Sequence, residues 1–168
     1  MKNTVSKSPA VLILAMCSLL LGCLPAEQKV SISYLAVNHT AHSVIDITVN
    51  GQGGVLNASA YGGGGKQVCC VTLPAVWRPG LMVTIGWQGP GQWLKDEQGR
   101  EVIRDGNTQL IEDPVKTRTV EVPRYETKDL QHFDIHFLAD DEIKVIVSWN
   151  LPHHPDYPIR YPEPPQEK

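Results

Sequence analysis

The stretch that decides the fold is residues 132–149, which read HFDIHFL-ADDE-IKVIVSW. Apolar and polar residues alternate on both sides of the acidic ADDE segment, and such alternation is typical of β-strands with one buried face. The pattern predicts a β-hairpin with residues 139–142 at its tip. Each half has an apolar face of three alternate residues: Phe133, Ile135 and Phe137, then Val145, Val147 and Trp149.

Alternation also predicts strands on the N-terminal side of this hairpin. They cover residues 31–37, 44–50, 68–73, 81–87 and 117–122. Turn residues such as Asn50-Gly51 separate them, and no stretch has convincing helical periodicity. About seven short strands with turns between them indicate an all-β fold, an antiparallel β-sandwich over residues 31–150. A long polar connection from 88 to 113 interrupts the strand series.

The last segment, residues 151–168, contains six prolines. Proline lacks a backbone N–H and fixes its own φ, so this segment cannot be a helix or a central strand. Two alternatives remain, an extended polyproline-like strap over the domain or a disordered end.

The N-terminus has the features of an export signal. Lys2 and Lys7 precede an apolar run from 10 to 21, which is shorter than the roughly 20 residues needed to span a bilayer. The run ends in LLGC at residues 20–23, which resembles the lipobox of bacterial lipoproteins. The resemblance implies removal of residues 1–22, lipidation of Cys23 and a short tether, residues 23–30. Leu24 stands where an aspartate would resemble the inner-membrane retention signal, so we expect outer-membrane anchoring that faces the periplasm.

Charge gives a weak indication of the partner. Removing residues 1–22 takes away two lysines and changes the formal charge from −3 to −5. Such a chain has no electrostatic footprint for nucleic acid. An acidic surface would suit a basic protein partner.

Only two cysteines, Cys69 and Cys70, remain after Cys17 is removed and Cys23 is lipidated. In an oxidising compartment they could form a vicinal disulfide, pair with other molecules, or stay as buried thiols. A vicinal bond requires a turn, because neighbours on a strand point to opposite faces. Two cysteines without a second Cys or His pair fall short of a zinc set, so we expect no metal and no cofactor.

Two further patterns invite a chemical interpretation. The glycine run at 62–65 precedes Lys66, but it lacks the spacing and the following helix of a phosphate-binding loop. It is either a flexible connection or a backbone-rich surface for a partner. His132, Asp134 and His136 share one face of a predicted strand and could ligate a metal or support acid–base chemistry. Their apolar alternate positions favour a solvent-facing or partner-facing row.

Nucleophile motifs such as Gly-x-Ser-x-Gly and His-Glu-x-x-His are missing from the sequence. We therefore expect a binding module and not an enzyme. A redox enzyme using Cys69 or Cys70 fits less well, because no Cys-x-x-Cys motif is present.

Several motifs together resemble a family of proteobacterial lipoproteins known as a domain of unknown function. They are NHT at 38–40, VNG at 49–51, the glycine run into Cys69-Cys70, LP at 73–74, WRPG at 77–80, VEVP at 120–123 with Tyr125, and PDYP at 155–158. Some members of that family are periplasmic immunity proteins that neutralise phospholipase effectors of the type VI secretion system, including phospholipase D-type effectors. The resemblance implies a lipase inhibitor, and it transfers no inhibitory motif onto particular residues.

Inhibition would work by occlusion of the effector's active-site cleft or its membrane-docking face. Exposure and composition suggest nine contact residues: Gly62, Gly63, Gly64, Gly65, Lys66, Trp93, Asp140, Asp141 and Glu142. The alternative function is a structural or accessory envelope lipoprotein without a toxin partner.

Overall fold

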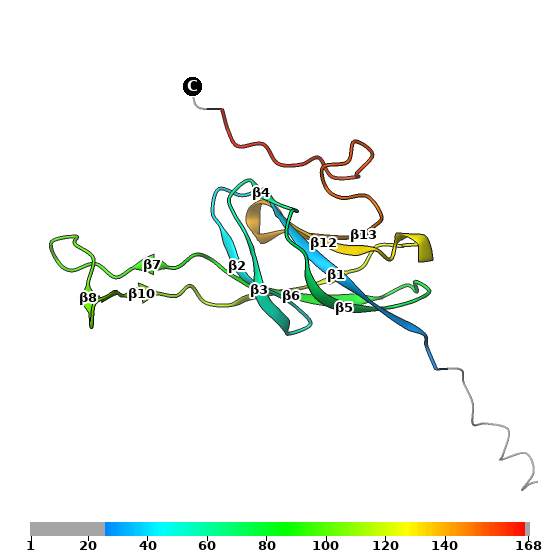
Figure 1. Ribbon diagram of the computed structural model, residues 1–168, viewed down its shortest axis with the longest axis horizontal. Coiled ribbons are helices and arrows are strands. Elements are labelled where there is room, and N and C mark those ends of the chain that lie inside the picture. Colours follow the sequence, from blue (N-terminus) through cyan, green and yellow to red (C-terminus); the bar gives the residue numbers. More distant parts are fainter. Residues whose placement is uncertain (1–25, 167–168) are drawn as a thin grey trace, which may run out of the picture.

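Two β-sheets pack face to face in a computed structural model that describes residues 26–166 (Figure 1). The expected signal peptide, residues 1–22, and the expected lipidation site Cys23 lie outside the described residues. The all-β sandwich predicted from the alternation pattern is confirmed. Within the described residues the helical elements are two short 3₁₀ turns, η2 (Thr127–Asp129) and η3 (Ala139–Asp141), and no helix is long and apolar enough to cross a membrane.

The first sheet contains the predicted hairpin at one edge. Its strands run in the order β13 (Ile143–Ser148), β12 (His132–Phe137) and β1 (Lys29–Asn38), and the far side of β1 is shared by β4 (Gly62–Gly63) and β5 (Val68–Pro74). β1 and β12 pair in parallel, from Ser33 opposite His132 to Asn38 opposite Phe137. This parallel pair departs from the antiparallel expectation. The chain leaves β1 at Asn38, and it enters β12 at His132, at the opposite end of the pair, beside Ser33. Such a crossover is what parallel pairing requires, and the segment between the two strands forms the second sheet and also contributes β4 and β5.

The second sheet is antiparallel throughout, in the order β11 (Lys116–Glu121), β6 (Met82–Gln88), β2 (Val44–Val49) and β3 (Gln52–Ala58). Asn50 and Gly51 join β2 to β3, with φ values of 51° and 74°. Two consecutive positive φ values are typical of the tight hairpin turn that Asn-Gly favours. β3 was not predicted from the sequence.

The core lies between the two sheets. Its fully buried side chains come from both sheets: Tyr34, Ile47, Leu56, Leu73, Ile85, Phe133 and Ile135. The predicted inner faces of the 132–149 hairpin are therefore confirmed, with one correction. Trp149 is 66% exposed, because β13 ends at Ser148 and the Ser148 hydroxyl exchanges hydrogen bonds with the backbone of Asn150.

The predicted polar connection forms a long projection, here called the arm (residues 89–113). Two short antiparallel ribbons build it, β7 (Gln92–Trp93) with β10 (Leu110–Ile111) and β8 (Ile103–Arg104) with β9 (Asn107–Thr108). The arm extends away from the sandwich (Figure 1). Hydrogen bonds between its two sides, such as Leu94 N to Gln109 O at 2.8 Å, hold it together.

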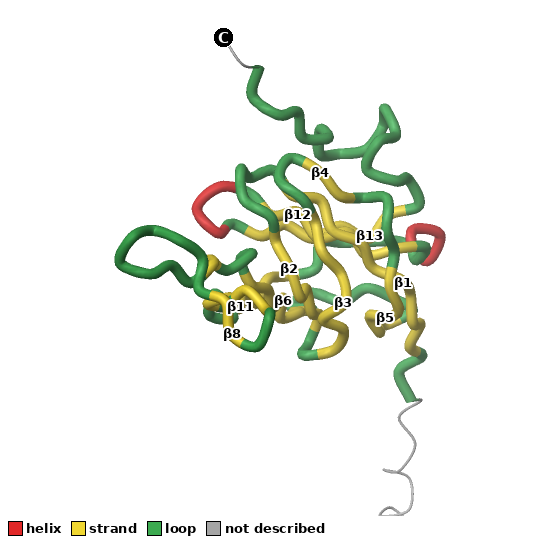
Figure 2. The backbone as a smooth tube through the Cα atoms, turned by 60° about the vertical axis from the view of Figure 1, so that its left-hand side comes forward, coloured by secondary structure: helices red, strands yellow, loops and turns green. Residues whose placement is uncertain are grey.

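Residues 151–166 contain no strand or helix and pack against the first sheet as a segment here called the strap (Figure 2). It begins with two consecutive turns, closed by hydrogen bonds from His154 N to Leu151 O at 2.8 Å and from Tyr157 N to His154 O at 3.0 Å. Tyr157 is 7% exposed, and Pro152 and Pro162 are buried. The Tyr161 hydroxyl donates a 2.8 Å hydrogen bond to the carbonyl of Gly63. The proline-rich tail is therefore packed against the domain, but its first half forms turns and is not the extended polyproline-like strap of the first alternative.

Candidate functional site

A row of ionisable side chains lies buried on β12. His132, Asp134 and His136 are 4%, 0% and 0% exposed. The expectation of a solvent-facing or partner-facing row is therefore wrong. The apolar alternate residues do face the core, as predicted, but the strap covers the opposite face of the strand.

One tyrosine of the strap joins this row into a network. The Tyr157 hydroxyl lies 2.7 Å from Asp134 Oδ2 and 2.8 Å from His136 Nε2. Asp134 Oδ1 lies 2.6 Å from His132 Nδ1, and His136 Nδ1 lies 3.0 Å from Nε2 of His39 at the end of β1. Five side chains from β1, β12 and the strap are thus connected.

The donors and acceptors of the network follow from the chemistry of its members. A carboxylate only accepts hydrogen bonds, so Tyr157 donates its O–H to Asp134 and accepts from the Nε2–H of His136. Nδ1 of His136 is then unprotonated and accepts from the Nε2–H of His39. His136 is neutral in this arrangement, and burial, with the nearby His39 charge second, lowers its pKa to about 3.

Burial also favours the neutral forms of Asp134 and Tyr157. It raises the pKa of Asp134, while hydrogen bonds from His132 and Tyr157 act in the opposite direction. Burial, followed by the charge of Asp134, raises the pKa of Tyr157. His132 Nε2 is buried and has no hydrogen-bond partner among the described residues. Asp134 and His136 are completely buried beneath the strap. The hydrogen bonds of Tyr157 to both residues fix the strap onto the sheet.

The glycine run is largely part of the fold. Gly63 has a φ of 113°, and a Cβ there would collide with the carbonyl oxygen of Ala36. Gly64 is buried and packs near Pro152 and Tyr161. Of the predicted contact residues in this segment, Gly62 and Gly63 are half-buried, whereas Gly65 and Lys66 are exposed. The Lys66 ammonium donates to the Val55 carbonyl at 3.2 Å.

The two cysteines form a vicinal disulfide at the start of β5. Cys69 is exposed and Cys70 is half-buried. No group of three or more histidine, cysteine, aspartate or glutamate side chains within residues 26–166 is arranged to hold a metal ion.

A cleft of about 680 Å³ lies where the arm joins the sandwich. The arm root, residues 88–92 and 113–116, forms one side, and the turn at 40–44 forms another. Asp140 and Asp141 from the predicted acidic tip complete it, and Asp141 pairs with Lys116 at 3.0 Å. Glu142 points elsewhere and lies 3.4 Å from Lys144. Two of the three predicted acidic contacts thus share a cleft with the arm.

The arm carries four large apolar side chains that are exposed. Trp93 is 51% exposed, as predicted, and it lies opposite Leu110, which is 43% exposed. Ile103 and Ile111 are 66% and 55% exposed. Residues 89–113 also have a formal charge of −3. Sequence reasoning missed the three aliphatic residues, because two-residue strands give no measurable alternation.

A family described as protein of unknown function (DUF3304) matches residues 37–145, more than half of the chain. The chain belongs to the DUF3304 family. No curated protein and no solved structure matches it. The DUF3304 match includes the arm, the cleft and the buried row of β12, whereas Tyr157 and the rest of the strap lie outside it.

Proposed function

We propose that the chain is a periplasm-facing lipoprotein, anchored to the outer membrane through Cys23, that acts as an immunity protein. It binds a type VI secretion phospholipase effector, including the phospholipase D type as a candidate, and inhibits it by occlusion. The observation that carries the proposal is the acidic arm, which projects from the sandwich and exposes Trp93, Leu110 and Ile111.

An arm of this kind fits the task of blocking a cleft. Large exposed apolar patches mark interaction sites on soluble proteins, and tryptophan is enriched at binding hot spots. A ribbon that is already ordered loses less conformational entropy on binding than a flexible loop does. A phospholipase binds phosphate head groups, so its docking face is expected to be basic and would attract the acidic arm.

A stoichiometric, non-enzymatic role agrees with the polar network. Catalysis needs an acid or base that contacts the substrate, and the buried groups of β12 are covered by the strap. Tight protection would need an interface of about 1,600 Å² in total. The arm with the adjoining cleft offers contact from two directions, from the apolar side chains of the arm and from Asp140 and Asp141.

A structural or accessory envelope lipoprotein is the second candidate. The arm would then bind another envelope component through the same exposed residues. The two functions differ in one measurable respect, since only an immunity protein abolishes a lipase activity.

The test is co-purification of the unlipidated chain, residues 24–168, with the product of a neighbouring lipase gene, followed by a phospholipase assay. We expect a stable complex without lipase activity. Absence of a complex, together with full activity at excess of the domain, would remove the inhibitor proposal and leave the envelope function. Anchoring is tested separately, because Cys23→Ser should move the protein from the membrane fraction to the soluble periplasmic fraction.

A further inference from the structure

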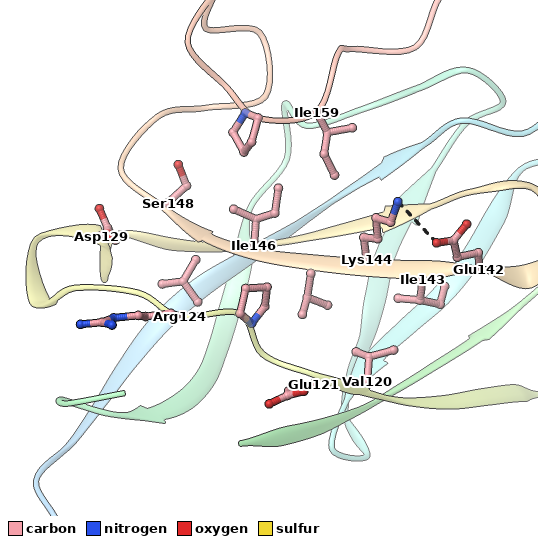
Figure 3. Close-up of a pocket in the computed structure, with 14 residues that line it drawn as sticks. Val120, Glu121, Arg124, Asp129, Glu142, Ile143, Lys144, Ile146, Ser148 and Ile159 are labelled. Carbon is pink, nitrogen blue, oxygen red and sulfur yellow. Dashed lines mark ion pairs between the residues drawn. The ribbon is translucent and has the colours of Figure 1, made fainter. Parts of the chain in front are cut away.

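A second concave surface lies away from the arm, between β13 and the end of β11. This groove has a volume of about 830 Å³. Its floor and walls are largely apolar, and its main apolar lining residues are Val120, Pro123, Ile143, Val145, Val147 and Ile159. Figure 3 shows the charged side chains Glu121, Arg124, Asp129, Glu142 and Lys144 around this lining. The groove plays no part in the function proposed above.

β13 presents an unpaired backbone edge to this groove. Among the described strands, β13 pairs with β12 and with no other. The Leu138 N–H donates to the Glu142 carbonyl at 2.9 Å, so the even-numbered residues of β13 direct their backbone groups toward β12. Along an antiparallel strand, successive residues direct their backbone groups alternately toward and away from the neighbouring strand. Ile143, Val145 and Val147 therefore direct their N–H and C=O groups away from β12.

The same three residues are almost inaccessible. Ile143, Val145 and Val147 are 6%, 3% and 8% exposed, and none forms a backbone hydrogen bond outside the sheet within the described chain. Their low exposure reflects side chains that face the core. The outward N–H and C=O groups of these three residues line the groove and have no partner among the described residues. An unpaired edge of this kind is a template for pairing with another strand.

This combination selects one kind of occupant. An acyl chain would fill the apolar volume and leave the backbone groups of β13 unpaired. A second copy of the chain would have to bring a complete sandwich past Pro123 and Ile159, which line the groove beside β13. An extended peptide is slender, supplies N–H and C=O groups, and can place alternate apolar side chains in the groove. The charges of both signs lie around the apolar lining, so the central residues of such a peptide would be uncharged.

We infer that the groove binds an extended segment of a partner protein, which adds as an antiparallel strand to the free edge of β13. Antiparallel pairing extends the β12–β13 hairpin and is slightly more stable per residue than parallel pairing. In this register the apolar residues of the segment lie opposite Ile143, Val145 and Val147, and they direct their own N–H groups toward β13. The polar residues of the segment direct theirs to solvent.

The test uses residues 24–168 and a short capped peptide of alternating valine and threonine, with two N-methylated versions as probes. Methylating every valine nitrogen removes the donors to β13, and we expect at least about tenfold weaker binding. Methylating every threonine nitrogen should leave the affinity within about twofold. Amide exchange measured by NMR should slow at Ile143, Val145 and Val147 when the unmodified peptide binds, and change little at Lys144 and Ile146.

A matched pair of protein variants tests the location. Ile159→Asp places a charge in the groove wall and should weaken peptide binding about tenfold or more, whereas Ile111→Asp on the arm should not. Three outcomes would overturn the proposal: no peptide binding at millimolar concentration, equal or reversed effects of the two methylation patterns, or binding of a fatty acid such as cis-parinaric acid without binding of the peptide.

Discussion

Tyr157 of the strap donates a 2.7 Å hydrogen bond to Asp134, a carboxylate that is completely buried on β12. The two residues are 23 positions apart, and no regular secondary structure connects the end of β13 to Tyr157. This contact explains why a segment rich in proline, which forms no ladder hydrogen bonds of its own, has a fixed path over the sheet.

Removing that hydroxyl should loosen the strap. Tyr157→Phe leaves Asp134 and His136 each without one buried partner, which typically costs about 1–3 kcal/mol of unfolding free energy. Tyr161→Phe is the matched control, because its hydroxyl bonds a single carbonyl and Tyr161 is half-buried. Urea denaturation of both variants measures the difference. Equal losses would show that the network does not fix the strap.

Stability should decrease as the pH falls below about 6.5. The folded pKa of His136 is about 3, below the unfolded value of 6.5, and burial also lowers the pKa of His39. Between pH 6.5 and pH 3 the unfolded chain binds more protons than the folded chain does. The unfolding free energy is therefore highest above pH 6.5 and decreases as the pH falls toward 3. The slope from one such histidine is at most about 1.4 kcal/mol per pH unit.

Denaturation curves between about pH 7 and pH 5 check this. The raised pKa of Asp134 acts in the opposite sense above 3.8, so the curves are compared between variants that all keep Asp134. His136→Gln should flatten the dependence, although it also lowers stability overall. His154→Gln makes the same change at an exposed histidine of the strap that lies outside the network, and it is the control. An unchanged slope in the His136 variant would contradict the assignment.

The glycine run offers a comparison of two neighbours. Gly63→Ala places a methyl group against the Ala36 carbonyl at a φ of 113° and should cost about 2 kcal/mol or more. Gly65→Ala meets nothing within 4 Å and should change stability by no more than about 0.5 kcal/mol. Thermal unfolding of the two variants distinguishes a structural glycine from a free one.

Binding of the effector should depend on the arm. Trp93→Ala is expected to weaken the complex about 30-fold, the effect of losing a hot-spot side chain worth about 2 kcal/mol. Trp149→Ala is the control, because this tryptophan is 66% exposed and lies after β13. Calorimetric titration against the effector separates them, and similar affinities for both variants would exclude the arm as the contact.

The acidic tip should act mainly on the association rate. Asp140 has a φ of 57°, so lysine would add backbone strain, whereas asparagine tolerates this conformation. Asp140→Asn should slow association with a basic effector a few-fold at low salt, with little change at high salt. Asp156→Asn removes the same charge from the strap and should leave the rate unchanged. Stopped-flow measurements at two salt concentrations decide the matter.

Alternation over five or more residues was sufficient to predict β12 and β13 and their core-facing residues. The alternation pattern failed to predict β3. The glycines at positions 53 and 54 have no side chain that could alternate, and only two residues of the strand, Leu56 and Ala58, are buried. Polarity alone could not reveal the burial of His132, Asp134 and His136, since their partner Tyr157 comes from a segment without periodicity. The exposure of Trp93 followed from its polar surroundings.

The parallel pair of β1 and β12 has a consequence for the order of assembly. Ser33 lies near the start of the domain, yet its neighbour in the sheet is His132. A polypeptide synthesised from its N-terminus therefore contains β1 long before β12, and the centre of the first sheet can close only when residues up to 137 have been made. Contacts so distant in sequence slow folding. During that interval one edge of β1 has no neighbouring strand, and this is the state in which a chaperone or protease would bind the chain.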